Sequence, residues 1–226
     1  MLNENLKDKY KKDQEKFYTG RFNDFGLIIQ ADGWTSDSMA TYYYDQVVKI
    51  LLQNLKLDNK LSVLDIGSGH GFFYKYLREK YLLDDLNYSG IEINSESYKQ
   101  AKLMNPEAEY FNGDFLDYKF PQLNYDYTVF IGTFSIFASM SAKDVYGIVE
   151  ANLNKAFSFS NYGTVLLISK FVLPESSVAL LYETASGISE FYDLNTTIFG
   201  DYVALTLYKK KFVLDSYRDF QLPSDK

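Results

Sequence analysis

The chain of 226 residues contains no cysteine and a single histidine, His70. These absences exclude a disulfide framework, a cysteine nucleophile, a thiolate metal site and a metal site built from several histidines. No apolar run approaches the roughly 20 residues that span a bilayer. The start Met1-Leu2-Asn3-Glu4 also lacks the basic and apolar parts of a secretory signal. We therefore expect a cytoplasmic protein with no membrane partner and no metal.

Positive charge is also scarce, since 23 basic residues stand against 30 acidic ones and give a net charge of −7. Nucleic acids are bound mainly through clustered lysine and arginine side chains that contact phosphates. The lysines between residues 7 and 16 are interleaved with Asp8, Asp13 and Glu15, which indicates a solvated helix face. The charge balance therefore argues against a nucleic-acid partner and favours a small-molecule or protein partner.

Periodicity predicts an α/β fold in one continuous domain, because no internal repeat or low-complexity linker divides the chain. Residues 4–19 are expected to form a polar helix and residues 20–33 a loop. Helices are also predicted over residues 36–55, where apolar residues recur at helical spacing, and over 72–81, 95–104 and 142–157. Short apolar runs predict strands over residues 61–66, 88–93, 108–111, 125–131 and 164–169. Strands that alternate with helices form a parallel sheet with helices on both faces. Ligands bind such sheets at the carboxyl ends of the strands.

A glycine-rich turn follows the first strand of this series. Asp65-Ile66-Gly67-Ser68-Gly69-His70-Gly71 places three glycines at alternate positions, where backbone turns sharply and approaches a ligand closely. A dinucleotide fingerprint would require a glycine at the position of Phe72. A phosphate-binding loop would require glycine, lysine and a hydroxyl residue where the chain has Phe72-Phe73-Tyr74. Neither of these two nucleotide-binding patterns fits.

With an acid two places before G-x-G-x-G, the chain resembles class I S-adenosylmethionine-dependent methyltransferases. Their first motif is similar to the segment from Asp65 to Gly71. The resemblance continues with Glu92 at the end of the second strand and with Asp114 just after the third. It ends with the strand at 125–131, which precedes Gly132, and it covers roughly residues 15–220. It implies a mostly parallel, Rossmann-like methyltransferase sheet with an N-terminal helical extension.

The same resemblance implies the methyl donor and its binding residues. The donor is S-adenosylmethionine, and the product is S-adenosylhomocysteine. In the family, the acid at Glu92 accepts the ribose hydroxyl hydrogens, the acid at Asp114 receives the adenine amino group, and Phe115 packs against the ring. Each motif also has a purely structural interpretation. The three glycines could form a tight turn without a ligand, Glu92 could be a surface acid or a helix cap, and Asp114 could be a turn residue. The implied cofactor-binding residues are Asp65, Gly67, Ser68, Gly69, Gly71, Glu92, Ile93, Asp114, Phe115 and Gly132.

Two further segments, 33–36 and 132–136, resemble a group of small, largely uncharacterised bacterial methyltransferases. On this basis residues 1–58 are expected to form a helical cap or lid, and residues 59–226 the Rossmann-like catalytic core, within one compact domain. Trp34 is either a lid residue over the donor and acceptor or a buried anchor. Phe134 and Ser135 either line the acceptor pocket or are ordinary packing residues. These three are the candidate substrate-binding residues.

The donor's sulfonium already activates the methyl group, so the protein must mainly align an acceptor atom and exclude water. A neutral amine attacks with its own lone pair, whereas an oxygen acceptor benefits from a general base. His70 is the candidate catalytic base because its ordinary pKa is near neutrality, although loop residues often point outward. Tyr18, Asp117 and Glu190 are further candidates without a ranking.

The sequence therefore predicts a methyltransferase that acts on an O or N atom of a small-molecule acceptor, such as a sugar or surface-glycan precursor. The alternative is a non-catalytic S-adenosylmethionine-binding sensor or regulatory subunit. A nicotinamide-dependent reductase is disfavoured because the glycine spacing does not fit.

The C-terminal part predicts a sixth strand over residues 211–217 and a seventh strand that is truncated or absent. A missing final strand would expose sheet edges, and pairing with a second copy is one remedy, so a homodimer is a further expectation. The aromatic stretch at 190–193 either closes over the pocket or joins such an interface. Of Tyr42, Tyr43 and Tyr44, at most two can face the core, because successive helical residues point in different directions.

Overall fold

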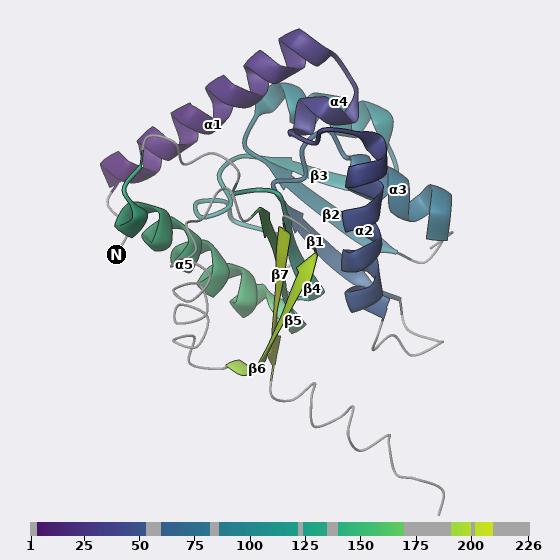
Figure 1. The fold of residues 1–226 in the computed structure, drawn as a ribbon, viewed down its shortest axis with the longest axis vertical. Helices are drawn as coiled ribbons and strands as arrows, with labels where there is room; N and C mark the ends of the chain where they lie inside the picture. The colour runs from purple at the N-terminus through teal and green to yellow at the C-terminus, as the bar shows by residue number, and fades with distance from the viewer. Residues whose placement is uncertain are drawn as a thin grey trace, which may run out of the picture.

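The fold is a seven-stranded sheet with helices on both faces (Figure 1). The computed structural model describes residues 4–52, 60–81, 86–121, 124–134, 140–169, 191–199 and 202–209. The strands are β1 (Ser62–Ile66), β2 (Asn87–Glu92), β3 (Glu109–Asn112), β4 (Tyr125–Ile131), β5 (Ser160–Ser169), β6 (Phe191–Phe199) and β7 (Tyr202–Lys209). The helices are α1 (Glu4–Phe25), the short 3-10 helix η1 (Ile29–Asp32), α2 (Asp37–Leu52), α3 (Phe72–Tyr81), α4 (Ser95–Met104) and α5 (Ala142–Phe159).

The strand order in space is β3-β2-β1-β4-β5-β7-β6. The first five strands in this order pair in parallel, whereas β7 pairs antiparallel with both β5 and β6. The parallel registers bring the carboxyl ends of β1, β2, β3 and β4 to one edge, which is where the sequence predicts ligand binding. The Rossmann-like fold and its five predicted parallel strands are therefore confirmed.

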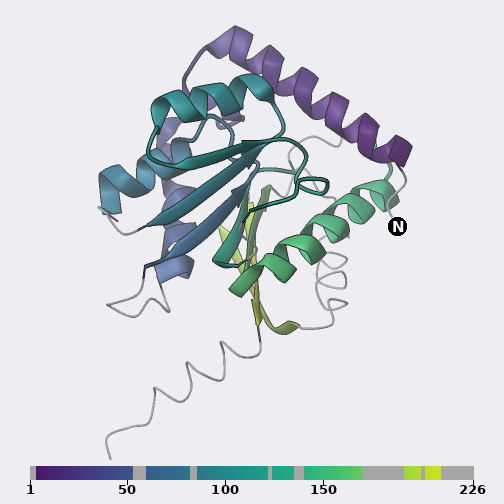
Figure 2. The ribbon, with the colours of Figure 1, turned by 180° about the vertical axis from the view of Figure 1, so that it is seen from behind.

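Two apolar cores cover the two faces of the sheet. One contains the buried side of α5, including Ile148 and Leu153, against inward residues such as Phe130. The other contains α2 and α3 against the opposite side chains of β1 and β4. Figure 2 shows α5 on its own side of the sheet, with α1 lying between the N-terminal end of α4 and the start of α5. Tyr43 and Tyr44 are buried and Tyr42 is 49% exposed, so two of the three tyrosines face the core, as predicted.

The expected loop at 20–33 is partly wrong. Helix α1 continues to Phe25, and η1 occupies Ile29–Asp32. Arg21 on α1 donates from Nε to the carbonyl of Gln30 in η1 at 2.9 Å. This bond and a left-handed Gly26 fold the chain back against its own helix, a tertiary arrangement that local propensity does not reveal.

The expectation that the final strand is missing is also wrong. Both late strands are present, and Phe199 pairs with Tyr202, so only residues 200–201 separate them. A Gly-Asp pair between two strand-like runs is a recognised two-residue hairpin pattern, and it is the local signal for this hairpin. The segment 211–217, where the sixth strand was expected, lies outside the described residues. Because the sheet contains its final strands, no missing strand favours a homodimer, and the oligomeric state stays a prediction. None of the helices in the described part of the chain is long and apolar enough to cross a membrane.

Candidate functional site

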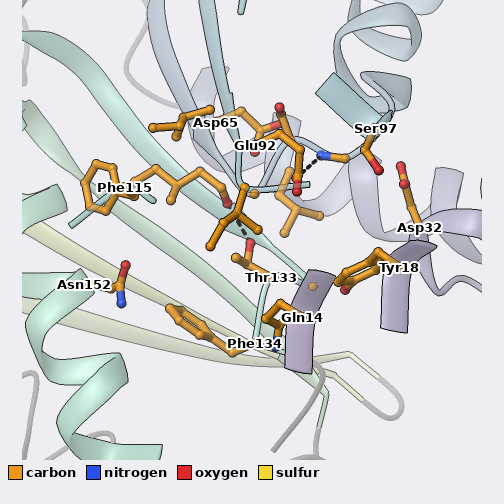
Figure 3. Close-up of a pocket in the computed structure, with 18 of the residues that line it drawn as sticks. Gln14, Tyr18, Asp32, Asp65, Glu92, Ser97, Phe115, Thr133, Phe134 and Asn152 are labelled. Atoms are coloured by element: carbon orange, nitrogen blue, oxygen red, sulfur yellow. Dashed lines mark hydrogen bonds between the residues drawn. The ribbon is translucent and has the colours of Figure 1, made fainter. Parts of the chain in front are cut away.

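A pocket with about 1020 Å³ of empty space, part of it open to solvent, lies at the carboxyl edge of the sheet (Figure 3). Its floor comes from the turns after β1, β2, β3 and β4, and α1 and α5 contribute walls. The sequence-predicted residues that line it are Asp65, Gly67, Ser68, Gly69, Glu92, Ile93, Asp114, Phe115, Gly132, Trp34 and Phe134. Of the other predicted residues, Gly71 and His70 do not line the pocket, and Ser135 lies outside the described residues.

The turn after β1 has the close backbone packing that its glycines suggest. Gly69 has φ +56°, and a Cβ built on it would lie 2.5 Å from a carboxylate oxygen of Asp32. Gly67 has φ +77°, and its Cβ would lie 2.5 Å from the Thr133 side chain. Glycine is required at both positions because the backbone is left-handed and no space for a side chain exists. The turn is therefore packed tightly against Asp32 and Thr133 where it lines the pocket.

Glu92 points into the pocket from the end of β2 (Figure 3). Its Oε2 accepts a hydrogen bond from Gly69 N at 2.9 Å, and its Oε1 accepts one from Asn94 N at 2.8 Å. Burial raises the pKa of this carboxyl group to about 7, against the opposing effect of the two backbone bonds. A carboxylate oxygen has lone pairs for more than one donor, so Glu92 can still accept from ligand hydroxyl groups.

Asp65 is 2% exposed and lies at the base of the same pocket. Its Oδ2 accepts a hydrogen bond from the Tyr88 hydroxyl at 2.6 Å, but its Oδ1 has no partner among the described residues. Burial raises the pKa of Asp65 to about 7, partly opposed by the Tyr88 bond. A buried carboxylate oxygen without a donor is unfavourable. A cationic or N–H group of a ligand would satisfy it.

The turn after β3 carries Asp114 and Phe115, and both line the pocket. Asp114 Oδ1 accepts a hydrogen bond from Leu116 N at 2.8 Å, which shapes the turn. Lys155 on α5 donates from Nζ to the carbonyl oxygens of Phe115, Leu116 and Tyr118 at 2.5, 3.0 and 2.9 Å. Burial lowers the pKa of Lys155 more than Asp114 and Asp117 raise it. One lysine therefore holds the whole turn.

Replacing Lys155 with methionine is expected to lower the melting temperature by several degrees. The substitution keeps an apolar stem but leaves three carbonyl groups without their donor, and each unsatisfied buried group costs about 1–3 kcal/mol. Thermal unfolding measures the effect. Lys102→Met on α4 is the matched control, because Lys102 is exposed and makes only a cation–π contact with Tyr98. Equal melting temperatures for the two variants would contradict the proposed role of Lys155.

His70 is fully buried, and its position does not favour the catalytic role predicted from the sequence. Its ring stacks on Phe22 with centroids 5.3 Å apart, its Nδ1 pairs with Asp32, and its Nε2 is 3.5 Å from Ser97 Oγ. Burial lowers the pKa of His70, but the hydrogen bond and charge of Asp32 outweigh it and leave the pKa above 6.5. The ring thus connects the turn after β1 to the N-terminal segment instead of facing the pocket.

The candidate substrate-binding residues differ in what they contact. Trp34 is 4% exposed and stacks on Tyr43 and Tyr202 at 5.8 and 5.5 Å between ring centroids, as a buried anchor would. It also borders the pocket, so the two interpretations of this residue are not exclusive. Phe134 lines the pocket and packs at 5.2 Å from Phe130.

Sequence reasoning missed several pocket residues. On helix α1 these are Lys7, Tyr10 and Gln14, which share a face with the candidate base Tyr18, and on α5 the missed residue is Asn152. The recurrence of Tyr10, Gln14 and Tyr18 every four residues on a polar helix was the available signal. Among the candidate bases, Tyr18 lines the pocket and Asp117 forms an ion pair with Lys7. Glu190 lies outside the described residues.

Comparisons with known proteins agree with this architecture. Residues 63–155 match the family described as methyltransferase domain. The magnesium protoporphyrin IX methyltransferase of Synechocystis PCC 6803 with bound S-adenosylmethionine is 14% identical. It has a TM-score of 0.63, and the match covers 93% of this chain and 99% of that one.

Two other solved structures are similar. The plantazolicin methyltransferase BpumL, in complex with a pentazolic desmethylPZN analog and S-adenosylhomocysteine, is 14% identical with a TM-score of 0.60, covering 92% of this chain and 99% of that one. A TehB-like methyltransferase of Corynebacterium glutamicum is 16% identical with a TM-score of 0.52, covering 77% of this chain and 100% of that one. At such identities the likeness concerns the fold. No curated protein sequence matches the chain.

Proposed function

We propose that the chain, whose residues 63–155 match a methyltransferase-domain family, transfers a methyl group from S-adenosylmethionine to an oxygen or nitrogen atom of a small-molecule acceptor, such as a sugar or surface-glycan precursor. The single observation that carries the proposal is the pocket at the carboxyl edge, where the glycine turn after β1, Glu92 and Asp114 converge. When bound, S-adenosylmethionine supplies a methyl group already activated by its sulfonium.

The residues present fit such a donor. The unpartnered Oδ1 of Asp65 favours a ligand that brings an N–H group or a positive charge. Gly67, Ser68 and Gly69 of the turn after β1 line the pocket, where they would lie beside the donor. Glu92 would hold the ribose hydroxyl groups, and Asp114 with Phe115 would hold the adenine. These assignments are proposals that ligand-binding measurements can test.

Uncharged polar side chains support a small, hydrogen-bonding acceptor. Gln14 and Asn152 are 3% and 7% exposed and flank Phe134 in the pocket (Figure 3). Burial raises the pKa of Tyr10 well above 10, so its hydroxyl group remains neutral. Carboxamides and hydroxyl groups recognise hydroxyl, amine and amide groups without requiring a formal charge. Helix α1 would thereby act as the cap that orients the acceptor and excludes water.

Contacts of α1 with the core support the assignment of residues 1–58 as a cap over the core at 59–226. Asn94, the N-cap of α4, donates from Nδ2 to Thr19 Oγ1 at 2.9 Å. Lys7 pairs with Asp117 in the turn after β3. The two contacts fasten α1 across the pocket near both ends of its inner face.

We expect S-adenosylhomocysteine to raise the melting temperature by roughly 5–10 °C. Ligand at 100 times its Kd adds about 2.7 kcal/mol, and 1 kcal/mol corresponds to about 2–4 °C for a domain of this size. An unchanged melting curve at millimolar ligand would exclude a donor site.

Incubation of the protein with isotopically labelled S-adenosylmethionine and metabolite extracts, followed by mass spectrometry, then identifies the methylated acceptor. Binding without turnover across broad extracts would instead indicate a sensor or regulatory subunit.

A further inference from the structure

Asp32 brings a third carboxylate into the donor end of the pocket. It is the last residue of η1, in the N-terminal segment, and it lines the pocket together with Asp65 and Glu92. Its carboxyl atoms lie 2.5–2.7 Å from the Cβ position of Gly69, directly over the middle glycine of the turn. Its side chain retains 12% exposure. An acid 38 residues away in the chain therefore covers the glycine turn.

The carboxylate of Asp32 is held in place from one side. His70 N donates to its two oxygens at 3.3 and 3.2 Å, and the His70 ring pairs with Oδ1 through Nδ1. The ring itself is fixed by stacking on Phe22 and by its 3.5 Å approach to Ser97. His70 is thus a positioning residue that presents Asp32 to the pocket.

A cationic ligand is also indicated by the buried carboxylate of Asp65, one of these three acids. Asp65 is 98% buried, and its Oδ1 has no hydrogen-bond partner in the described part of the chain. No group of three acidic or histidine side chains in the described residues has the arrangement of a metal site. The carboxylates nevertheless converge on one glycine turn. An organic cation with N–H donors can form charge-assisted hydrogen bonds with carboxylates in such an arrangement.

We propose that Asp32 binds the α-ammonium group at the amino-acid end of the methyl donor and of its demethylated product. The inference rests on the proposed function, because it assumes that the nucleoside lies against Glu92 and Asp114 and that its tail crosses Gly69. Asp32 then determines specificity for ligands that carry the amino-acid tail. Its counterpart His70 keeps the carboxylate at the turn and takes no part in proton transfer.

The test is the binding of two ligands by the full-length protein and by Asp32→Asn. S-Adenosylhomocysteine carries the α-ammonium group, and 5′-methylthioadenosine has the same nucleoside without the amino-acid tail. Asparagine keeps the size and the acceptor oxygen that meets His70 but removes the charge. Since a hydrogen bond to a charged group contributes about 1.5–3 kcal/mol, calorimetry should find S-adenosylhomocysteine bound roughly 10-fold to 100-fold more weakly. Binding of 5′-methylthioadenosine should change by less than about 2-fold.

Each outcome has one meaning. A parent protein that binds neither ligand refutes the proposed function itself. A parent that binds both, with Asp32→Asn unchanged for S-adenosylhomocysteine, refutes the role of Asp32 alone. If Asp32→Asn binds both ligands more weakly by the same factor, Asp32 maintains the shape of the turn and does not bind the ammonium group. This result would also overturn the inference. Asp37→Asn, in the first turn of α2 and outside the pocket lining, is the matched control for the loss of one negative charge.

Discussion

Gly69→Val is expected to abolish the rise in melting temperature that S-adenosylhomocysteine gives the parent protein. Gly69 adopts φ +56°, which a β-branched residue rarely tolerates, and its Cβ would lie within 2.7 Å of all three carboxyl atoms of Asp32. The valine must displace Asp32 or move the turn, and the amide that donates to Glu92 Oε2 moves with it. Both changes disturb groups that line the proposed donor site, so differential scanning fluorimetry should show no ligand-induced shift.

Gly26→Val separates the steric effect from general backbone strain. Gly26 also has a positive φ, +67°, but a Cβ there meets no atom within 4 Å. Both variants should unfold at a lower temperature than the parent, since each forces valine into a left-handed conformation. Only Gly69→Val should lose the response to ligand. A full ligand-induced shift in Gly69→Val would mean that the turn after β1 does not contact the donor.

The predictable part of the fold follows from local pattern. Strand β4 reads as an almost continuous apolar run because both faces of a central parallel strand are buried, and its predicted bounds, 125–131, match those observed. Helix α4 begins where Asn94 accepts hydrogen bonds from Glu96 N and Ser97 N, a capping arrangement that the residue types suggest. The final hairpin is harder to predict. Its turn signal is only two residues long, at 200–201, and the aromatic residues near 190 are as typical of a pocket or an interface as of a strand.

The candidate site divides in the same way. Residues within a local motif, such as Gly69 and Glu92, reach the pocket because consecutive parallel strands end at one edge. Asp32 and Gln14 reach it only because the N-terminal segment folds back across that edge, and no local pattern encodes that path. The surroundings of His70 have the same origin: its ordinary pKa indicates proton transfer, but its partners Asp32 and Phe22 come from elsewhere in the chain.

The melting temperature of the ligand-free protein should fall as the pH rises from 5.5 to 8. The pKa values of Asp65 and Glu92 are raised to about 7 in the folded state, from ordinary values of 3.8 and 4.5. Between about pH 4 and 7 the folded state therefore holds protons that the unfolded state has released, and stability falls with pH until the folded groups ionise. The raised pKa of His70 acts in the same direction, since the stability from its ion pair with Asp32 is present below pH 6.5 and lost as pH rises through the folded pKa.

A loss of on the order of 2 kcal/mol per buried carboxylate corresponds to a fall of roughly 4–8 °C in a domain of this size. Glu92→Gln removes one of the two titrating acids and should reduce the slope of melting temperature against pH. Glu79→Gln, which removes an exposed acid on α3 outside the pocket, should leave the slope unchanged.

Because a cationic ligand favours the ionised carboxylates, it should lower their pKa values, release protons on binding and bind more tightly at pH 8 than at pH 6. The shift caused by S-adenosylmethionine should accordingly be larger at pH 8, and a shift independent of pH would show that neither Asp65 nor Glu92 faces the donor's charge.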